Sequence, residues 1–302
     1  MSTPPFLTLP GSARSIRLAT ARGEFAALHA LPANAQVRGT ALLLPGFTGS
    51  KEDFIALLEP LAAAGFQVLA MDQRGQYQTG GPADPAAYGL EPLALDLLAM
   101  TAALPGPADR PVHLLGHSFG GYVVREAVLS TAAAGTALPW DSLTLMSTGP
   151  GPVDTDERKR AELLVSVLPL MDLEAIWQAM KDLEAASEGS EPGQQLQPEI
   201  AEFLHRRWLA NVPEALAAMG RQLTVEPDRV DALAGVELPK LVLSGQQDYA
   251  WPVEQQAEMA RRLGVRYAAI AGAAHSPNAE RPEDTAATLV DFWSGITRRT
   301  NS

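Results

Sequence analysis

The feature that most constrains the fold is an alternation of short apolar segments with amphipathic segments of helical period. The apolar segments have the length and continuous hydrophobicity of strands that are buried on both faces. They are predicted at residues 40–44, 66–71, 111–115, 142–146, 239–244 and 265–270. The helices between and after them are predicted at residues 51–64, 91–104, 122–130, 253–263 and 281–296. This alternation indicates an α/β fold whose mostly parallel sheet carries helices on both faces.

Two further segments modify this plan. Residues 15–20 and 24–30 are predicted to pair as an antiparallel hairpin at one sheet edge, which brings the sheet to eight strands. Residues 150–236 contain no convincing strand, and helices are predicted there at residues 157–168, 173–186, 199–210 and 214–222. We therefore expect a core domain of residues 1–149 and 237–302, interrupted by a helical insertion of residues 150–236.

Composition excludes several classes of function. The chain has no cysteine, so disulfides, cysteine-based zinc sites and a thiol nucleophile are ruled out. The net charge is −12, and residues 150–231 hold 16 acidic against 8 basic side chains, a net −8. This charge opposes binding to nucleic acid or anionic membranes. Because residues 1–14 lack a secretory signal pattern and no apolar run could cross a bilayer, we expect a cytoplasmic protein.

One turn carries a pattern associated with catalysis. The segment Gly116-His117-Ser118-Phe119-Gly120-Gly121 follows a predicted buried strand and precedes a predicted helix. In the pattern Gly-x-Ser-x-Gly, a serine sits on a sharp strand-to-helix turn, and residues without a Cβ let strand and helix approach closely. A glycine-rich turn without function is the alternative, but the position between strand and helix favours a nucleophilic serine.

A serine nucleophile needs a base, and that base needs an orienting acid. Of the five histidines, His275 is the best candidate because it lies among small residues just past a predicted strand end. Asp248 occupies the same position after another strand, although it could instead serve as a turn or helix-capping residue. Asp72 also ends a strand, but Arg74 is its natural ion-pair partner in a structural turn.

With these residues in place, the chain resembles the α/β-hydrolase-fold serine hydrolases of the esterase and lipase type that carry a helical cap. The resemblance runs from about residue 14 to residue 293, apart from the insertion. It implies Ser118 as the nucleophile, His275 as general base and acid, and Asp248 as its partner. It also implies an oxyanion hole made by the backbone N–H groups of Phe47 and Phe119, and a cap formed by residues 150–236 over the site. The matching motifs are Leu43-Leu44-Pro45-Gly46-Phe47, Asp72-Gln73-Arg74-Gly75, Gly116 to Gly121, Gly245-Gln246-Gln247-Asp248 and Gly272-Ala273-Ala274-His275.

The chain departs from the family pattern at two places. Pro45-Gly46 stands where members commonly have His-Gly, and Gln76-Tyr77 stands where Gly-Ser usually follows the Asp72 motif. Relatives resembling dehalogenases and epoxide hydrolases carry aspartate at the nucleophile position, and they form an alkyl-ester intermediate that Ser118 cannot form. The serine therefore favours acyl transfer through an acyl-serine.

The expected reaction is hydrolysis of a small to medium, uncharged or hydrophobic carboxylic ester. Trp251, close after Asp248, and Trp177, in the insertion, are candidate substrate contacts. The apolar faces of the insertion could equally form its own core. Carbon–carbon bond hydrolysis, thioester hydrolysis, perhydrolysis and acyl transfer remain open with the same triad, as does a non-catalytic binding protein on this fold. No cofactor or metal site is expected, the expected partner is a small molecule, and the oligomeric state is not predicted.

Overall fold

The centre of the protein is one eight-stranded sheet. The structure, a computed structural model, describes residues 2–33, 36–107, 109–187 and 196–298. The strands are β1 (Ala13–Thr20), β2 (Gly23–Ala30), β3 (Gly39–Leu44), β4 (Phe66–Met71), β5 (Val112–His117), β6 (Ser142–Met146), β7 (Lys240–Gly245) and β8 (Arg266–Ile270). They are ordered β1-β2-β4-β3-β5-β6-β7-β8 across the sheet. The predicted fold class is confirmed.

Strand direction follows the predicted plan. β1 pairs with β2 as an antiparallel hairpin at one edge, in a register that sets Thr20 opposite Gly23, and β2 is antiparallel to β4. Every other neighbouring pair, from β4 through to β8, is parallel. Because parallel strands end at the same sheet edge, the loops after β3, β5, β7 and β8 gather there.

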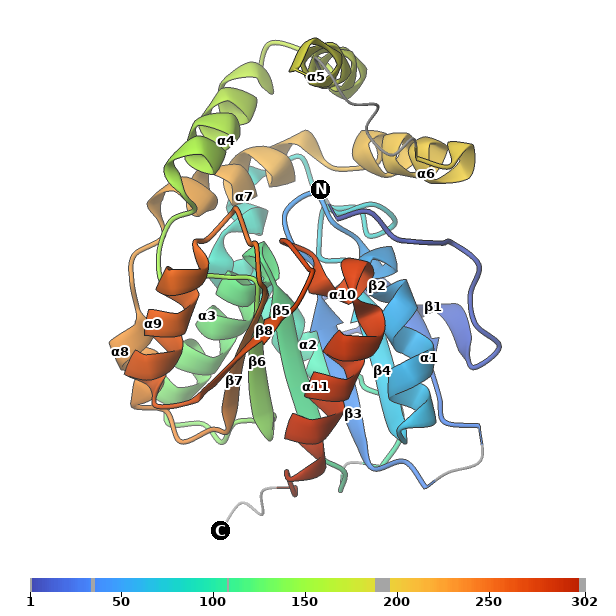
Figure 1. Ribbon diagram of the computed structural model, residues 1–302, viewed down its shortest axis with the longest axis vertical. Helices are drawn as coiled ribbons and strands as arrows, with labels where there is room; N and C mark the ends of the chain where they lie inside the picture. Colours follow the sequence, from blue (N-terminus) through green and yellow to red (C-terminus); the bar gives the residue numbers. More distant parts are fainter. Residues whose placement is uncertain (1, 34–35, 108, 188–195, 299–302) are drawn as a thin grey trace.

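Helices cover both faces of the sheet. Figure 1 shows α1 (Ile55–Ala63) and α11 (Pro282–Ser294) in front of it, and α2 (Leu90–Ala102) and α3 (Phe119–Ala133) behind it. The second face also carries α8 (Val230–Ala234) and α9 (Val253–Leu263), which contact each other. The remaining helical segments are η1 (Lys51–Phe54), η2 (Pro85–Tyr88), α4 (Thr155–Val167), α5 (Leu173–Ser187), α6 (Pro198–Leu209), α7 (Pro213–Val225) and α10 (Pro277–Glu280).

Side chains of one strand alternate between two apolar cores. Leu42 and Leu44 of β3 belong to the core under α2 and α3, whereas Ala41 and Leu43 belong to the core under α1 and α11. Since successive side chains of a strand point to opposite faces, a strand covered on both sides must be apolar throughout. This explains why the parallel strands read as continuous apolar runs rather than as alternating ones.

Several helix boundaries differ from the sequence prediction. The helix expected at residues 51–64 begins with the tight turn η1 before α1. The helix expected at residues 281–296 is α11, and it begins at Pro282, which has no N–H to continue the preceding turn of α10 and is well suited to start a helix. The short segments η2, α8 and α10 were not predicted.

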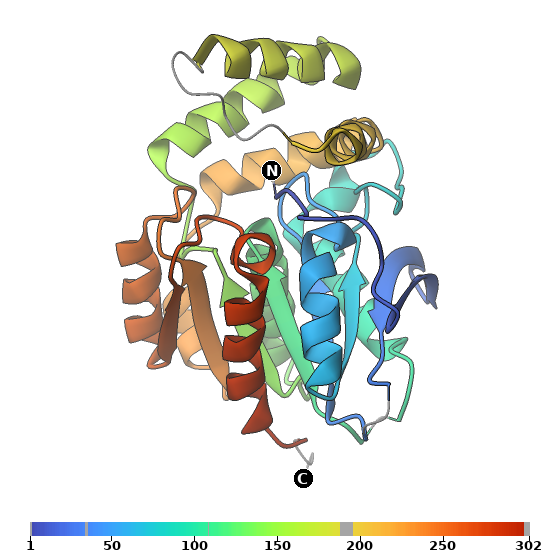
Figure 2. The same cartoon turned by 45° about the vertical axis from the view of Figure 1, so that its right-hand side comes forward.

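Between β6 and β7 the described chain contains only helices, α4 to α8. Figure 2 shows α4, α5, α6 and α7, coloured from green to orange, at the end of the molecule where the N-terminus also lies. Residues of α5, α6 and α7 form a third apolar core that includes Trp177, Phe203 and Trp208. Met171 and Leu209, two other large apolar side chains of residues 150–236, are each 39% exposed. Leu7, Phe47 and Tyr77 from the rest of the chain pack against this third core, so it joins the insertion to the loops at this end of the sheet.

A buried ion pair fastens α6 to the rest of the protein. Arg207 of α6 donates from Nη1 to the Oδ1 atom of Asp53 in η1 at 2.6 Å and from Nη2 to the carbonyl oxygen of Ser2 at 2.8 Å. The Asp53 carbonyl in turn accepts a hydrogen bond from Asn278 at 2.6 Å. Burial raises the pKa of Asp53, while the charge and hydrogen bond of Arg207 oppose that shift.

Replacing Arg207 by methionine should therefore destabilise the protein strongly. Removing one partner of a buried pair leaves the other desolvated without compensation, which typically costs about 3–5 kcal/mol. The matched control is Arg206→Met on the same helix, whose partner Glu202 is exposed, and its expected cost is below about 1 kcal/mol. Urea unfolding gives both free energies of unfolding, and equal losses would contradict a structural role for the Arg207 pair.

Candidate active site

Ser118 lies on a strained turn between β5 and α3. Its backbone has φ 54° and ψ −122°, a conformation that non-glycine residues rarely adopt. Its N–H donates to the carbonyl oxygen of Met146 at 2.9 Å. A Cβ at Gly116 would overlap the Gly120 carbonyl, and one at Gly120 would lie 2.6 Å from the Leu44 carbonyl oxygen. The glycines of the motif are thus required by backbone contacts.

His275 and Asp248 are hydrogen-bonded to each other at the same sheet edge. Nδ1 of His275 lies 2.9 Å from Oδ1 of Asp248, and their loops follow the neighbouring strands β8 and β7. The carboxylate also accepts hydrogen bonds from the Ala250 N–H and the Gln256 side chain, each at 2.9 Å. Burial raises the pKa of Asp248, but these bonds and His275 outweigh it and hold that pKa below its usual value.

His117 joins the serine turn to the His275 loop. Its Nε2 atom lies 2.9 Å from the His275 carbonyl oxygen, and the two rings are 5.0 Å apart. A carbonyl oxygen can only accept, so Nε2 carries the proton. Burial and then the nearby His275 lower the pKa of His117 to about 3, which keeps the ring neutral. The sequence analysis selected only His275 among the histidines, and nothing in the neighbours of His117 could have revealed this link.

The loop after β3 packs directly against Ser118. A Cβ at Gly46 would lie 2.8 Å from Cβ and 3.1 Å from Oγ of Ser118, so only glycine fits there. Within the described residues, the N–H groups of Phe47 and Phe119 donate to no protein acceptor. Phe119 is the first residue of α3, where helix N–H groups have no partner within the helix. Both groups can therefore donate to a ligand bound at this edge.

The two tryptophans predicted to contact a substrate lie in different surroundings. Trp251 is fully buried, its ring centroid is 6.1 Å from that of His275, and its Nε1 donates to the Gly151 carbonyl at 2.9 Å. Trp177 packs between His205 and Trp208 in the core of the insertion. Tyr249, which sequence reasoning missed, is 52% exposed, and its ring is 5.3 Å from that of His275.

The predicted ion pair between Asp72 and Arg74 is wrong. Asp72 accepts hydrogen bonds from the backbone N–H of Lys51 at 2.7 Å and from its Nζ at 3.1 Å. Arg74 instead donates to Asp96. Burial raises the pKa of Asp72 to about 7 against the opposing charge of Lys51. Partners so far apart in the chain carry no local sequence signal.

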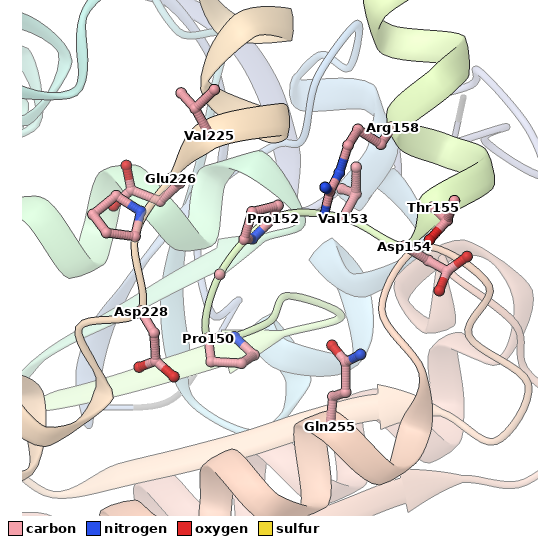
Figure 3. A pocket seen from close by; sticks show the side chains of 12 residues that line it. Pro150, Pro152, Val153, Asp154, Thr155, Arg158, Val225, Glu226, Asp228 and Gln255 are labelled. Atoms are coloured by element: carbon pink, nitrogen blue, oxygen red, sulfur yellow. The ribbon is translucent and has the colours of Figure 1, made fainter.

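A cavity of about 500 Å³ lies apart from these residues. It is lined by residues 150–155 and Arg158, from the connection after β6 and the start of α4, by residues 225–228, from the end of α7 and the connection after it, and by Gln255 of α9 (Figure 3). None of Ser118, Asp248 and His275 lines it. In the described part of the chain, no group of three or more His, Cys, Asp or Glu side chains could hold a metal ion. No described helix is long and apolar enough to cross a membrane.

Comparison with solved structures supports the fold. A thermophilic esterase from Thermogutta terrifontis has 23% sequence identity and a TM-score of 0.69, and the match covers 95% of this chain and 100% of that one. An enol-lactonase from Burkholderia xenovorans LB400 has 19% identity and a TM-score of 0.70, over 92% of this chain and 100% of that one. Epoxide hydrolases found in metagenomes from hot environments include one with 19% identity and a TM-score of 0.69, over 96% and 100%.

At these identities the structures establish the fold alone, and their activities differ. The sequence comparison goes further, because the model of the alpha/beta hydrolase family matches residues 41–288, most of the chain. That match includes the Gly46 loop, the Ser118 turn and the loops that carry Asp248 and His275. The chain therefore belongs to the alpha/beta hydrolase family.

Proposed function

We propose that this protein hydrolyses carboxylic esters through an acyl-serine intermediate. The observation that carries the proposal is the Asp248–His275 hydrogen bond at the edge where the Ser118 turn is held. With Nδ1 bonded to Asp248, the Nε2 atom of His275 is left to accept the hydroxyl proton as Ser118 Oγ attacks the ester carbonyl. His275 then gives that proton to the departing alcohol.

The negative oxygen of the tetrahedral intermediate needs donors close to Ser118. The N–H groups of Phe47 and Phe119 are free within the described chain, and the backbone at Gly46 contacts the Ser118 side chain. A donor aimed at this oxygen typically lowers the barrier by about 3–4 kcal/mol. In the second half of the cycle, His275 removes a proton from water, which attacks the acyl-serine and releases the acid.

A serine at this position favours ester chemistry over the epoxide hydrolysis found among the similar structures. An aspartate nucleophile would be needed for an alkyl-ester intermediate, and Ser118 cannot supply one. Within residues 150–236, the proposal treats α4, α5, α6 and α7 as a cap and assigns α8, which covers the sheet, to the core. Two observations support this division. Helices α4, α5, α6 and α7 lie at the end of the molecule where the N-terminus also lies (Figure 2). The hydroxyl of Ser2, in that N-terminal segment, is hydrogen-bonded to the hydroxyl of Ser276, the residue after His275.

Electrostatics support an uncharged substrate. Lys51 follows the Gly46 loop and Arg207 pairs with Asp53 close by, and each of these cations is buried against carboxylates. Lys51 pairs with Glu52 and Asp72, so it is not available to bind an anionic group. Most of the excess negative charge lies in residues 150–231. This charge would repel an anionic substrate, and neither Lys51 nor Arg207 is free to bind one.

Labelling with a fluorophosphonate probe tests the nucleophile. The wild-type protein should react covalently, while Ser118→Ala should not react and His275→Ala should react far more slowly. Ser130→Ala, at a serine on the far half of α3, is the matched control and should label as the wild type does. Equal labelling of Ser118→Ala would move the nucleophile elsewhere, and an unreactive wild type would refute the proposal.

Replacing Asp248 by asparagine tests the orienting acid. The amide would present a donor to Nδ1 and favour the wrong tautomer of His275, so kcat should fall roughly 10³- to 10⁴-fold with the fold intact. Asp231→Asn, at an exposed residue of α8, should leave kcat unchanged. Near-normal turnover by Asp248→Asn would assign the role to another carboxylate.

A series of p-nitrophenyl esters tests the substrate class. With an apolar, uncharged site, kcat/KM should rise from the acetate ester to an ester with a longer acyl chain. For the hemisuccinate, kcat/KM should be at least about tenfold lower than for the neutral ester of equal length. The hemisuccinate and the neutral ester differ by one carboxylate, so this comparison isolates the effect of the charge. Preference for acetate over every longer chain, or for the hemisuccinate, would contradict this substrate class.

A further inference from the structure

Two buried glutamines hold the loop that carries the Phe47 N–H. Nε2 of Gln76 donates to the carbonyl oxygen of Gly46 at 2.8 Å, and Nε2 of Gln73 donates to that of Pro45, also at 2.8 Å. Each glutamine is 1% exposed. Side chains from the loop after β4 thus bind two successive carbonyls of the loop after β3.

The Gly46 carbonyl and the Phe47 N–H belong to the same peptide unit. That unit is planar and trans, so its C=O and N–H point in opposite directions and cannot turn independently. A hydrogen bond that fixes the direction of the Gly46 oxygen therefore also fixes the direction of the Phe47 N–H. The N–H of Gly49 binds the same oxygen at 3.1 Å, but that bond lies within the loop. The Gln76 bond ties the loop to a different segment.

The Gln76 amide is itself fixed. Its Oε1 atom accepts the backbone N–H of Gln73 at 3.1 Å, so a flipped amide would set donor against donor and acceptor against acceptor. The backbone of Gln76 is held as well, because its N–H donates to the Gln73 carbonyl and its carbonyl accepts from Thr79. The donor that meets Gly46 thus has one position.

We propose that Gln76 is a positioning residue that aims the Phe47 N–H at the negative oxygen formed during catalysis, with Gln73 bracing the preceding peptide. This role rests on the proposed ester hydrolysis. It links the two departures from the family pattern, since Gln76 is one of them and the Pro45-Gly46 segment that the two glutamines bind is the other. The hydrogen bond to Gly46 also polarises the peptide, which strengthens the Phe47 N–H as a donor.

The decisive variants are Gln76→Met and Gln76→Glu. Both keep the length of the side chain and remove the amide donor, so kcat should fall on the order of 10²-fold with KM changed less than about twofold. A boronic acid that forms a tetrahedral adduct with Ser118 should lose affinity by a similar factor, because it presents an oxygen to the same donor. Gln78→Met, at an exposed glutamine of the same loop, should change none of these values.

The glutamate variant adds a signature that a packing role would not produce. At high pH the introduced carboxylate cannot donate to Gly46, but once protonated its O–H can, while its other oxygen accepts from Gln73. The ratio of variant to wild-type kcat should therefore rise as pH falls from 8 to 5, and the ratio for Gln76→Met should stay flat. The ratio is measured on folded protein at every pH, so a loss of stability in the variant would not produce the same rise in the kcat ratio.

Any of three outcomes would overturn the positioning role. The first is a wild-type kcat in both Gln76 variants, and the second is a loss of kcat with unchanged boronate affinity. The third is a ratio of Gln76→Glu to wild-type kcat that does not change with pH. A failure of the underlying activity is distinguishable, because it is seen in the wild type as absent fluorophosphonate labelling and absent ester turnover. Positive labelling of the wild type with unaffected Gln76 variants would reject this inference alone.

Discussion

The candidate site depends on the close approach of three backbones at the carboxyl end of β5. The turn at Ser118 adopts a strained conformation, which typically costs about 1–3 kcal/mol and persists only where the surroundings allow no other. Here the Gly120 backbone lies against the carbonyls of the β3 loop, and Gly46 lies against the Ser118 side chain. A larger residue at any of these contacts would push serine, helix and loop apart together. Backbone contacts thus set most of the geometry around the Ser118 hydroxyl. Such contacts hold a position more rigidly than contacts between side chains do.

Buried polar contacts extend this rigid centre to segments that are distant in sequence. Asp53 follows the Gly46 loop. Its carboxylate accepts a hydrogen bond from Arg207 of the helical insertion, and its backbone carbonyl accepts one from Asn278, three residues after His275. Arg207 also binds the carbonyl of Ser2, whose hydroxyl meets Ser276. A displacement of α6 would therefore disturb the loops on both sides of the candidate site. Because each partner is desolvated, these bonds are costly to break singly, and the insertion is better regarded as fastened than as freely moving.

Much of the fold could be predicted because its signals are local and periodic. Continuous apolar runs located all six predicted parallel strands. Ser118, Asp248 and His275 were chosen from the other serines, acids and histidines because each follows the end of a strand. The failures have a common cause. Lys51 rather than Arg74 pairs with Asp72, and Gln256 supports Asp248 from α9, because buried polar groups take whichever partner the folded chain presents. Pro282 gave a local signal for the start of α11, whereas the short helices α8 and α10 were not predicted.

The same reasoning applies to the two places where the chain departs from the family pattern. A carbonyl buried in the Gly46 loop needs a donor, but the physics does not specify which residue supplies it. In this chain Gln73 supplies the donor for the Pro45 carbonyl and Gln76 supplies the donor for the Gly46 carbonyl. The two segments that depart from the family pattern are therefore in direct contact in the fold. The proposed positioning role connects them, because the Gln76 amide holds the peptide unit that carries the Phe47 N–H.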